Sequence, residues 1–259
     1  MSMRPRIDVD DLRHRVRAVY QRVAHEPAAE FHFETGRALA EKLGYPAAEL
    51  DRIPPAALES FAGVGYAFDL AALRPGEHVL DLGSGAGTDV FLAALAVGDE
   101  GRVVGVDMTD EQLDKAEALR SRFAFDNVRF VHAYLEDLPF EPERFDAIIS
   151  NGVINLAAEK DAVFREAARV LKPGGRMAFS DIVTETQLTE DIVCDAALWA
   201  ACIGGAAQQD DYRGMIEAAG LRVLTVRVND RYGFLSKSAR SASERFGVRS
   251  VSLLAERPA

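Results

Sequence analysis

The sequence predicts an α/β fold in which helices cover a parallel sheet, and two observations indicate it. Short apolar segments that end in glycine or aspartate, such as residues 78–82 and 102–107, alternate with segments whose apolar residues recur at helical spacing, such as residues 88–96. Alternation of this kind requires crossover connections, which join parallel strands in right-handed units. The alternation extends over residues 76–183, which we expect to form the core of the fold.

The N-terminal zone, residues 1–75, is helical in pattern and contains no strand-like segment. Apolar residues at helical spacing predict helices over residues 9–24 and 30–43. Gly44 and Pro46 are typical helix-ending residues and close the second of them. Because these helices have no strand to join, we expect them to form a lid over the carboxyl edge of the sheet, where ligands of open α/β sheets bind.

The core zone, residues 76–183, contains five strand segments and three helices. Thr109 is a suitable N-cap for one helix, and Asp110 and Glu111 follow in its first turn, where the helix dipole favours anions. The predicted strands are residues 78–82, 102–107, 128–131, 145–150 and 177–182. The predicted helices are residues 88–96, 110–123 and 159–171.

The third zone, residues 184–259, is mixed. Two helices are predicted over residues 189–203 and 210–219, and two strands over residues 222–228 and 250–255. We expect the strands to complete the sheet and the helical stretch after the fifth strand to contribute to the binding site.

Composition excludes several classes of protein. The chain has 259 residues and a net charge of −11, so it lacks the basic surface that nucleic acids and anionic membranes require. The longest apolar run, residues 196–207, is shorter than the roughly 20 residues of a membrane span, and the charged first 11 residues do not resemble a signal peptide. Two cysteines exclude a disulfide network. We therefore expect a cytoplasmic monomer or homodimer that binds a small molecule and no metal.

A glycine-rich loop at residues 83–87 follows the first strand and precedes a helix. Such loops let a ligand approach the backbone closely, although a glycine turn without a ligand is the alternative interpretation. The dinucleotide fingerprint would need a further glycine where the chain has Thr88. Asp81 would repel a diphosphate but attract a cationic ligand, and Asp107, at the end of the second strand, can accept ribose hydroxyl protons.

Residues 79–87 and 106–108 resemble the first two motifs of class I S-adenosylmethionine (SAM) methyltransferases. The resemblance implies a Rossmann-like, mostly parallel seven-stranded sheet whose last strand is antiparallel, a transferase activity, and SAM as cofactor. It implies that Asp107 binds the ribose, that Met108 lies against the adenine and that residues 135–136 contact its edge. The implied cofactor-binding residues are Asp81, Gly83, Ser84, Gly85, Gly87, Asp107, Met108, Leu135, Glu136 and Asn151.

A narrower resemblance links residues 105–109, 150–156, 180–182 and 202–206 to the arsenite methyltransferase family. That family binds trivalent arsenic through several cysteine thiolates. The chain departs from it at two of these positions, where it has Val64 and Gly152, and only Cys202 matches a family thiol. Cys194 lies two helical turns before Cys202 and could share its helix face. Because two thiols are too few for three-thiolate capture, we expect another acceptor, such as a thiol or other small metabolite.

Three residues are candidates for catalysis: His32, Tyr66 and Cys202. Of these, His32 is the expected base for an oxygen or nitrogen acceptor, because histidine exchanges protons near neutral pH. Ordinary core packing is the competing interpretation for the aromatic residues of the predicted acceptor pocket, and a buried apolar role is the competing interpretation for Cys202. The other expected pocket residues are Phe33, Trp199, Tyr232 and Phe234.

Two further functions stay open at this point. One is a divergent arsenite methyltransferase that uses Cys194 and Cys202 as its thiols. The other is a SAM-binding regulatory or interaction module without turnover.

Overall fold

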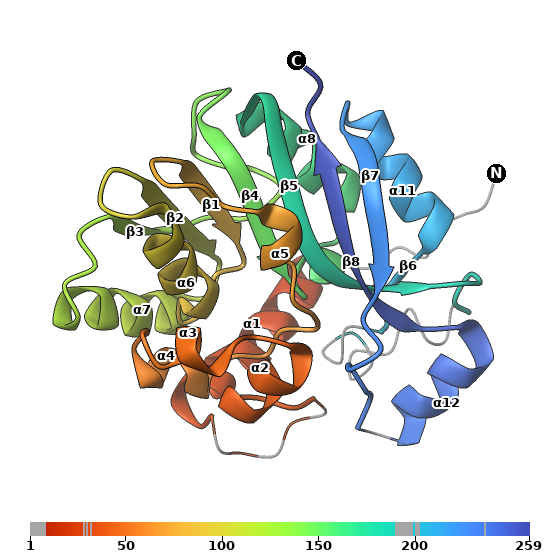
Figure 1. Ribbon diagram of the computed structural model, residues 1–259. Coiled ribbons are helices and arrows are strands. Elements are labelled where there is room, and N and C mark those ends of the chain that lie inside the picture. The colour runs from red at the N-terminus through yellow and green to blue at the C-terminus, as the bar shows by residue number, and fades with distance from the viewer. Residues whose placement is uncertain are drawn as a thin grey trace.

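The computed structural model describes residues 9–27, 29, 31, 33–189, 199, 203–235 and 237–259. These residues form one α/β unit with a sheet between two layers of helices, as Figure 1 shows. The strand order is β3-β2-β1-β4-β5-β8-β7, and a short strand, β6, pairs with the end of β5. The predicted α/β fold is therefore confirmed.

The five strands from β3 to β5 are parallel, and β8 runs antiparallel to both β5 and β7. The predicted arrangement of seven strands with the last one antiparallel is correct, and β6 adds a strand of two residues. Along β4 the partner residue on β5 passes from Leu171 to Arg176, so residues 172–175, between the predicted helix over residues 159–171 and the predicted strand over residues 177–182, form an irregularity within β5. The strands are β1 His78–Leu82, β2 Arg102–Asp107, β3 Val128–His132, β4 Phe145–Asn151, β5 Leu171–Thr184, β6 Ala207–Gln208, β7 Arg222–Val228 and β8 Arg249–Glu256.

The helices follow the predicted pattern with one clear correction. The helix predicted over residues 30–43 begins only at Arg37, because Gly36 has φ +86 and its N–H donates to the carbonyl oxygen of Phe61 at 2.8 Å. The predicted helix over residues 189–203 lies mostly outside the described residues, and α12 was not predicted. The helices are α1 Val9–His25, α2 Arg37–Leu43, α3 Ala47–Leu50, α4 Pro55–Glu59, α5 Phe68–Ala71, α6 Thr88–Val97, α7 Asp110–Arg122, the 3₁₀ helix η1 Ile154–Leu156, α8 Lys160–Val170, α11 Gln209–Ala218 and α12 Lys237–Phe246.

Alternate residues of the central strands pack into different layers. Leu80 and Ile148 lie in a core with α8 and α11, whereas their neighbours Val79 and Ile149 lie in a core with α5 and α6. This alternation is the period-two pattern of strands that are covered on both faces. It leaves the two ends of the sheet as the places where a ligand can reach the strands.

The N-terminal helices lie at the carboxyl ends of the parallel strands, at the lower edge of the sheet in Figure 1. Helices α2 to α4 pack against α6 and α7, whereas α1 contributes Leu12 and Val16 to a cluster that also contains Leu156 and Phe246. Helices α1 and α12 therefore contribute side chains to the same apolar cluster. No helix among the described residues is both long and apolar enough to cross a bilayer.

Substitution of Phe164, on α8, tests how much the core between the sheet and helices α8 and α11 contributes to the stability of the fold. Its ring is fully buried against Phe179 and Tyr212, with ring centroids 5.9 and 5.2 Å away. Phe164→Ala should lower the free energy of unfolding by about 3–5 kcal/mol, because it leaves a cavity in packed core. The matched control Phe123→Ala removes a ring that is 43% exposed, and it should change the free energy of unfolding by no more than about 0.5 kcal/mol. Equal urea midpoints for the two variants would contradict this account.

Candidate active site

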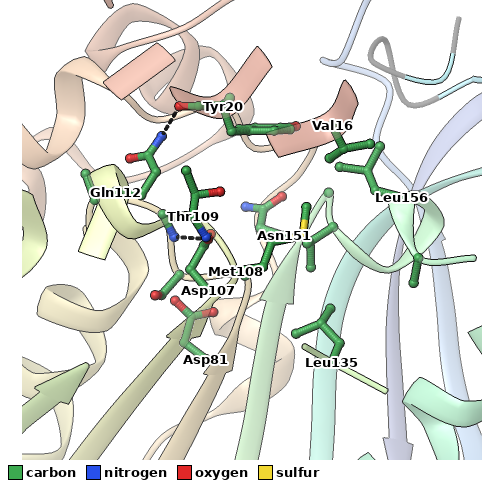
Figure 2. Close-up of a pocket in the computed structure, with 18 of the residues that line it drawn as sticks. Val16, Tyr20, Asp81, Asp107, Met108, Thr109, Gln112, Leu135, Asn151 and Leu156 are labelled. Atoms are coloured by element: carbon green, nitrogen blue, oxygen red, sulfur yellow. Dashed lines mark hydrogen bonds between the residues drawn. The ribbon is translucent and has the colours of Figure 1, made fainter. Parts of the chain in front are cut away.

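A cavity of about 1080 Å³, open mouth included, lies at the carboxyl ends of the parallel strands. Figure 2 shows Asp81 and Asp107 together on one side of it, Leu135 and Leu156 on the other, and Val16 and Tyr20 of α1 above. Segments from the N-terminal zone and from the ends of β1, β2, β3 and β4 surround it. The lining residues are 13, 16, 20, 60–63, 81, 83–86, 88, 89, 107–109, 112, 133–136, 151–153 and 156–158.

The glycine loop forms the floor of the cavity between β1 and α6. Gly83 has φ +74, and a Cβ at this position would lie 2.6 Å from Cγ2 of Val153, so only glycine fits here without strain. The N–H groups of Gly83 and Ser84 both donate to the carbonyl oxygen of Val106 at 2.9 Å, which ties the loop to β2. The loop thus brings bare backbone to the cavity, as a close-fitting ligand requires.

Asp107 ends β2 with its carboxylate between two backbone donors. Its Oδ2 accepts from the N–H of Gly85 and its Oδ1 from the N–H of Thr109, both at 2.9 Å. Burial raises the pKa of Asp107, and these N–H groups oppose that shift. Each oxygen keeps a lone pair for a further donor, such as a hydroxyl group of the ligand.

Two more carboxylates, Asp81 and Asp89, lie on the same side of the cavity and are 2% and 8% exposed. Burial raises the pKa of Asp81 well above its usual value, and the charges of Asp89 and Asp107 raise it further. Burial also raises the pKa of Asp89 to about 6, against the lowering effect of hydrogen bonds from Tyr45 and Asn151. Three carboxylates that disfavour one another's ionisation create a site in which a cation is stabilised.

Asn151, at the end of β4, uses its side chain to hold the segment 64–65. Its Oδ1 accepts from the N–H of Val64 at 2.8 Å and of Gly65 at 3.3 Å. Its Nδ2 donates to the carbonyl oxygen of Gly65 and to the hydroxyl of Tyr45, both at 2.9 Å. Asn151 therefore lines the cavity, but its amide group forms hydrogen bonds with the protein that hold the cavity wall.

Helix α1 is attached to the opposite wall of the cavity by two arginines. Arg13 forms an ion pair with Glu136 at 3.3 Å, and its guanidinium group lies 4.4 Å from the ring centroid of Tyr134. Arg17 donates to the hydroxyl of Tyr134 at 2.8 Å. The segment 134–136, which includes the residues 135–136 predicted to contact the adenine, is thus in contact with the N-terminal zone.

The structure brings nine of the ten predicted cofactor-binding residues to this cavity. The tenth, Gly87, lies behind the loop as the N-cap of α6. Of the candidate catalytic residues, Tyr66 is not among the lining residues and packs on Tyr45 and Phe68 instead. His32 and Cys202 lie outside the described residues, as does Cys194.

Sequence reasoning missed several residues of the site. Arg13 lines the cavity only through the packing of the N-terminal zone, and Tyr45 contributes indirectly, because its hydroxyl donates to Asp89 at 2.8 Å. Asp89 had a local signal, because it is the one charged residue in the segment Thr88–Val97, which is otherwise apolar apart from Thr88. Trp199, an expected pocket residue, is 5% exposed and is not among the described residues that line the cavity.

Comparison with known proteins identifies the family. Residues 73–220 match the family model described as "Methyltransferase domain". The chain belongs to the SAM-dependent methyltransferase family. This methyltransferase is 41% identical to the arsenite methyltransferase of Halobacterium salinarum over 197 residues. The match covers 76% of this chain and 50% of that protein. It is also 42% identical to the arsenite methyltransferase of Aquipseudomonas alcaligenes over 178 residues. This match covers 66% of this chain and 51% of that protein. The chain thus spans about half the length of the curated relatives it matches.

Solved structures agree with this assignment. The arsenic(III) SAM methyltransferase CrArsM of Chlamydomonas reinhardtii has a TM-score of 0.69 and 32% identity, over 82% of this chain and 73% of CrArsM. A geranyl diphosphate C-methyltransferase of Streptomyces coelicolor has a TM-score of 0.66 over 93% and 98%, but at 18% identity it shows the fold alone. The predicted membership in the SAM-dependent methyltransferase family is therefore confirmed, and the acidic side of the cavity suits the cationic cofactor of that family.

Asp107→Ala tests the predicted ribose site of the methyltransferase. The change removes an acceptor for ribose hydroxyl groups, and charge-assisted hydrogen bonds contribute about 1.5–3 kcal/mol each. We expect the affinity for SAM to fall about ten-fold or more in titration calorimetry. Asp114→Ala, at an exposed position of α7, is the matched control and should leave the affinity unchanged. The same dissociation constant in both variants would remove Asp107 from the binding site.

Proposed function

We propose that this methyltransferase transfers the methyl group of SAM to a small organic acceptor, such as a thiol or other small metabolite, and not to trivalent arsenic. The observation that carries this proposal is the pair of residues Val64 and Gly152. Both stand where the arsenite family, by resemblance, has thiols. A wall without thiols at these positions cannot offer the soft ligands that trivalent arsenic prefers.

The geometry of this pair supports the proposal. Val64 is 2% exposed, and Gly152 lines the cavity next to Asn151. A Cβ built at Gly152 would lie 3.2 Å from Cγ1 of Val64, so the two positions face each other. Gly152 also has φ +74, a conformation that strains other residues. The chain thus presents glycine backbone and an isopropyl group where a pair of thiolates would have to stand.

When bound, SAM supplies an electrophilic methyl group on a sulfonium and leaves as a neutral thioether. The protein's own contribution is then mainly orientation and the exclusion of water. The side of the cavity with Asp81, Asp89 and Asp107 holds the cofactor, and the segment 60–63 with residues 152–158 forms the remaining wall, where the acceptor would lie.

A thiol acceptor in its thiolate form needs no base at the moment of transfer, whereas an oxygen or nitrogen acceptor requires one, for which we propose His32. Tyr66 does not suit this role, because burial raises its pKa to about 12 and the phenol keeps its proton at neutral pH. Cys202 remains a proposed member of the acceptor site. Its place, like that of His32, lies outside the described residues.

We further propose that residues 1–75 act as a lid, residues 76–183 as the cofactor-binding core, and residues 184–259 as an acceptor-site insertion with strands that complete the sheet. The contacts of Arg13, Val16 and Tyr20 with the cavity support the lid. We also propose a cytoplasmic enzyme, monomeric or homodimeric, without nucleic-acid or membrane partners. The net charge of −11 favours this choice of partners.

A divergent arsenite methyltransferase is the second candidate, because the curated relatives carry that name. It would have to use Cys194 and Cys202 as its thiols. A SAM-binding module without turnover is the third. Incubation with labelled SAM and separate pools of thiols, phenols and arsenicals distinguishes the three functions, because each predicts label in a different pool or in none. Label in the thiol or phenol pool supports the proposal.

Arsenite should be a poor acceptor. In the presence of glutathione and SAM we expect conversion well below about one turnover per second, a modest rate for an enzyme, because the thiols at positions 64 and 152 are missing. Mass spectrometry of methylated arsenicals measures the rate. Efficient conversion that is lost in Cys202→Ser would overturn the proposal and establish the second candidate.

Closure of the lid should be visible by hydrogen exchange. S-adenosylhomocysteine (SAH) should slow exchange of the amides in α1, because Arg13, Val16 and Tyr20 would then contact a filled cavity. Amides of α11, which does not line the cavity, serve as the internal control. Equal exchange in α1 with and without SAH would mean that this helix is a fixed part of the wall and does not respond to the ligand.

A further inference from the structure

Asp89 lies in a position that neither the family motifs nor the fold explains. It is the only charged residue of α6, its side chain faces the cavity, and it is 8% exposed. A carboxylate near a helix N-terminus, such as Asp89 in the first turn of α6, gains from the helix dipole. The dipole alone is a weak reason to bury a charge beside two other carboxylates.

The two oxygens of Asp89 have different surroundings. Oδ1 accepts from the hydroxyl of Tyr45 at 2.8 Å, and Tyr45 is itself 3% exposed and accepts from Nδ2 of Asn151. Oδ2 has Nδ2 of Asn151 only at 3.5 Å, the outer limit of a hydrogen bond. One oxygen is thus anchored, while the other retains the capacity to accept a strong donor from the cavity.

The charges around Asp89 define that donor. The charges of Asp89 and of Asp107 on β2 both act on Asp81 of β1. Among the described residues, Tyr45 and Asn151 donate hydrogen bonds to Asp89, and neither is cationic. A cationic ligand would relieve the repulsion among the carboxylates. The family's cofactor carries such a group, the ammonium of its amino-acid part, which is protonated below about pH 8.

We propose that Asp89 binds the α-ammonium group of the cofactor and that Tyr45 is its positioning residue. The inference rests on the cofactor of the proposed function and is independent of the acceptor. Through Asn151, the same hydroxyl of Tyr45 is connected to the segment 64–65. Binding of the ammonium group and placement of the acceptor wall therefore share one hydrogen-bond network.

Calorimetry with two ligands tests the proposal: SAH, and the same thioether without its α-amino group. The wild type should bind SAH about ten-fold or more tightly than the desamino compound. Asp89→Asn keeps the shape and an acceptor for Tyr45 but removes the charge, so it should bind both compounds with nearly equal affinity. Asp114→Asn, an exposed aspartate of α7, is the matched control and should discriminate as the wild type does. Full discrimination by folded Asp89→Asn would overturn the proposal.

Tyr45→Phe provides a second test, which is valid even if Asp89→Asn does not fold. The pKa of Asp89 is about 6, so the affinity of the wild type for SAH should be complete above this value and fall as the pH drops through it. The hydrogen bond from Tyr45 lowers the pKa of Asp89. Its loss in Tyr45→Phe should therefore raise this pKa and move the fall in affinity to higher pH. An unchanged pH profile would overturn the role of Tyr45. If the wild type does not bind SAH at all, the proposed function fails, whereas a failure to find an acceptor leaves both tests valid.

Discussion

Side chains from three strands, β4, β7 and β8, satisfy the hydrogen bonds of the backbone of residues 64–66 at one edge of the sheet. Asn151 of β4 binds both residues 64 and 65, and Ser250 of β8 donates to the carbonyl oxygen of Val64 at 2.6 Å. Arg227 of β7 donates to the carbonyl oxygen of Tyr66 at 2.8 Å. Because a buried backbone needs such partners, this segment cannot move without breaking several bonds, and the wall of the cavity next to it is held in place.

This attachment also explains two glycines that no ligand motif requires. A Cβ at Gly63 would lie 2.5 Å from Nδ2 of Asn151, and one at Gly65 would lie 2.2 Å from Nδ2 of Asn229. The segment approaches the strand ends so closely that a side chain would displace the groups that bind it. Small residues here serve the attachment of the N-terminal zone, and the ligand site benefits because its wall is rigid.

The acidic side of the cavity illustrates how a common scaffold acquires a specific site. The sheet alone does not determine a reaction, because one fold can carry many unrelated functions. In this chain the buried carboxylates of β1, β2 and α6 disfavour one another until a cation arrives. Among the described residues, the wall formed by the segment 60–63 and residues 152–158 has no charged side chain and no thiol.

The sequence by itself determined the alternation of strands and helices in the core, and nine of the ten residues that it predicted for cofactor binding line the cavity. The predicted bounds of β1, β2 and β7 match the structure, because each is a short apolar segment with a clear end. The predicted cofactor residues lie together since they follow successive parallel strands, whose carboxyl ends meet at one edge of the sheet. Only the tertiary structure decided that Arg13 reaches the cavity, that Tyr45 binds Asp89, and that α2 begins at Arg37. These placements depend on hydrogen bonds and packing between residues far apart in the chain, which leave no periodic signal in the sequence.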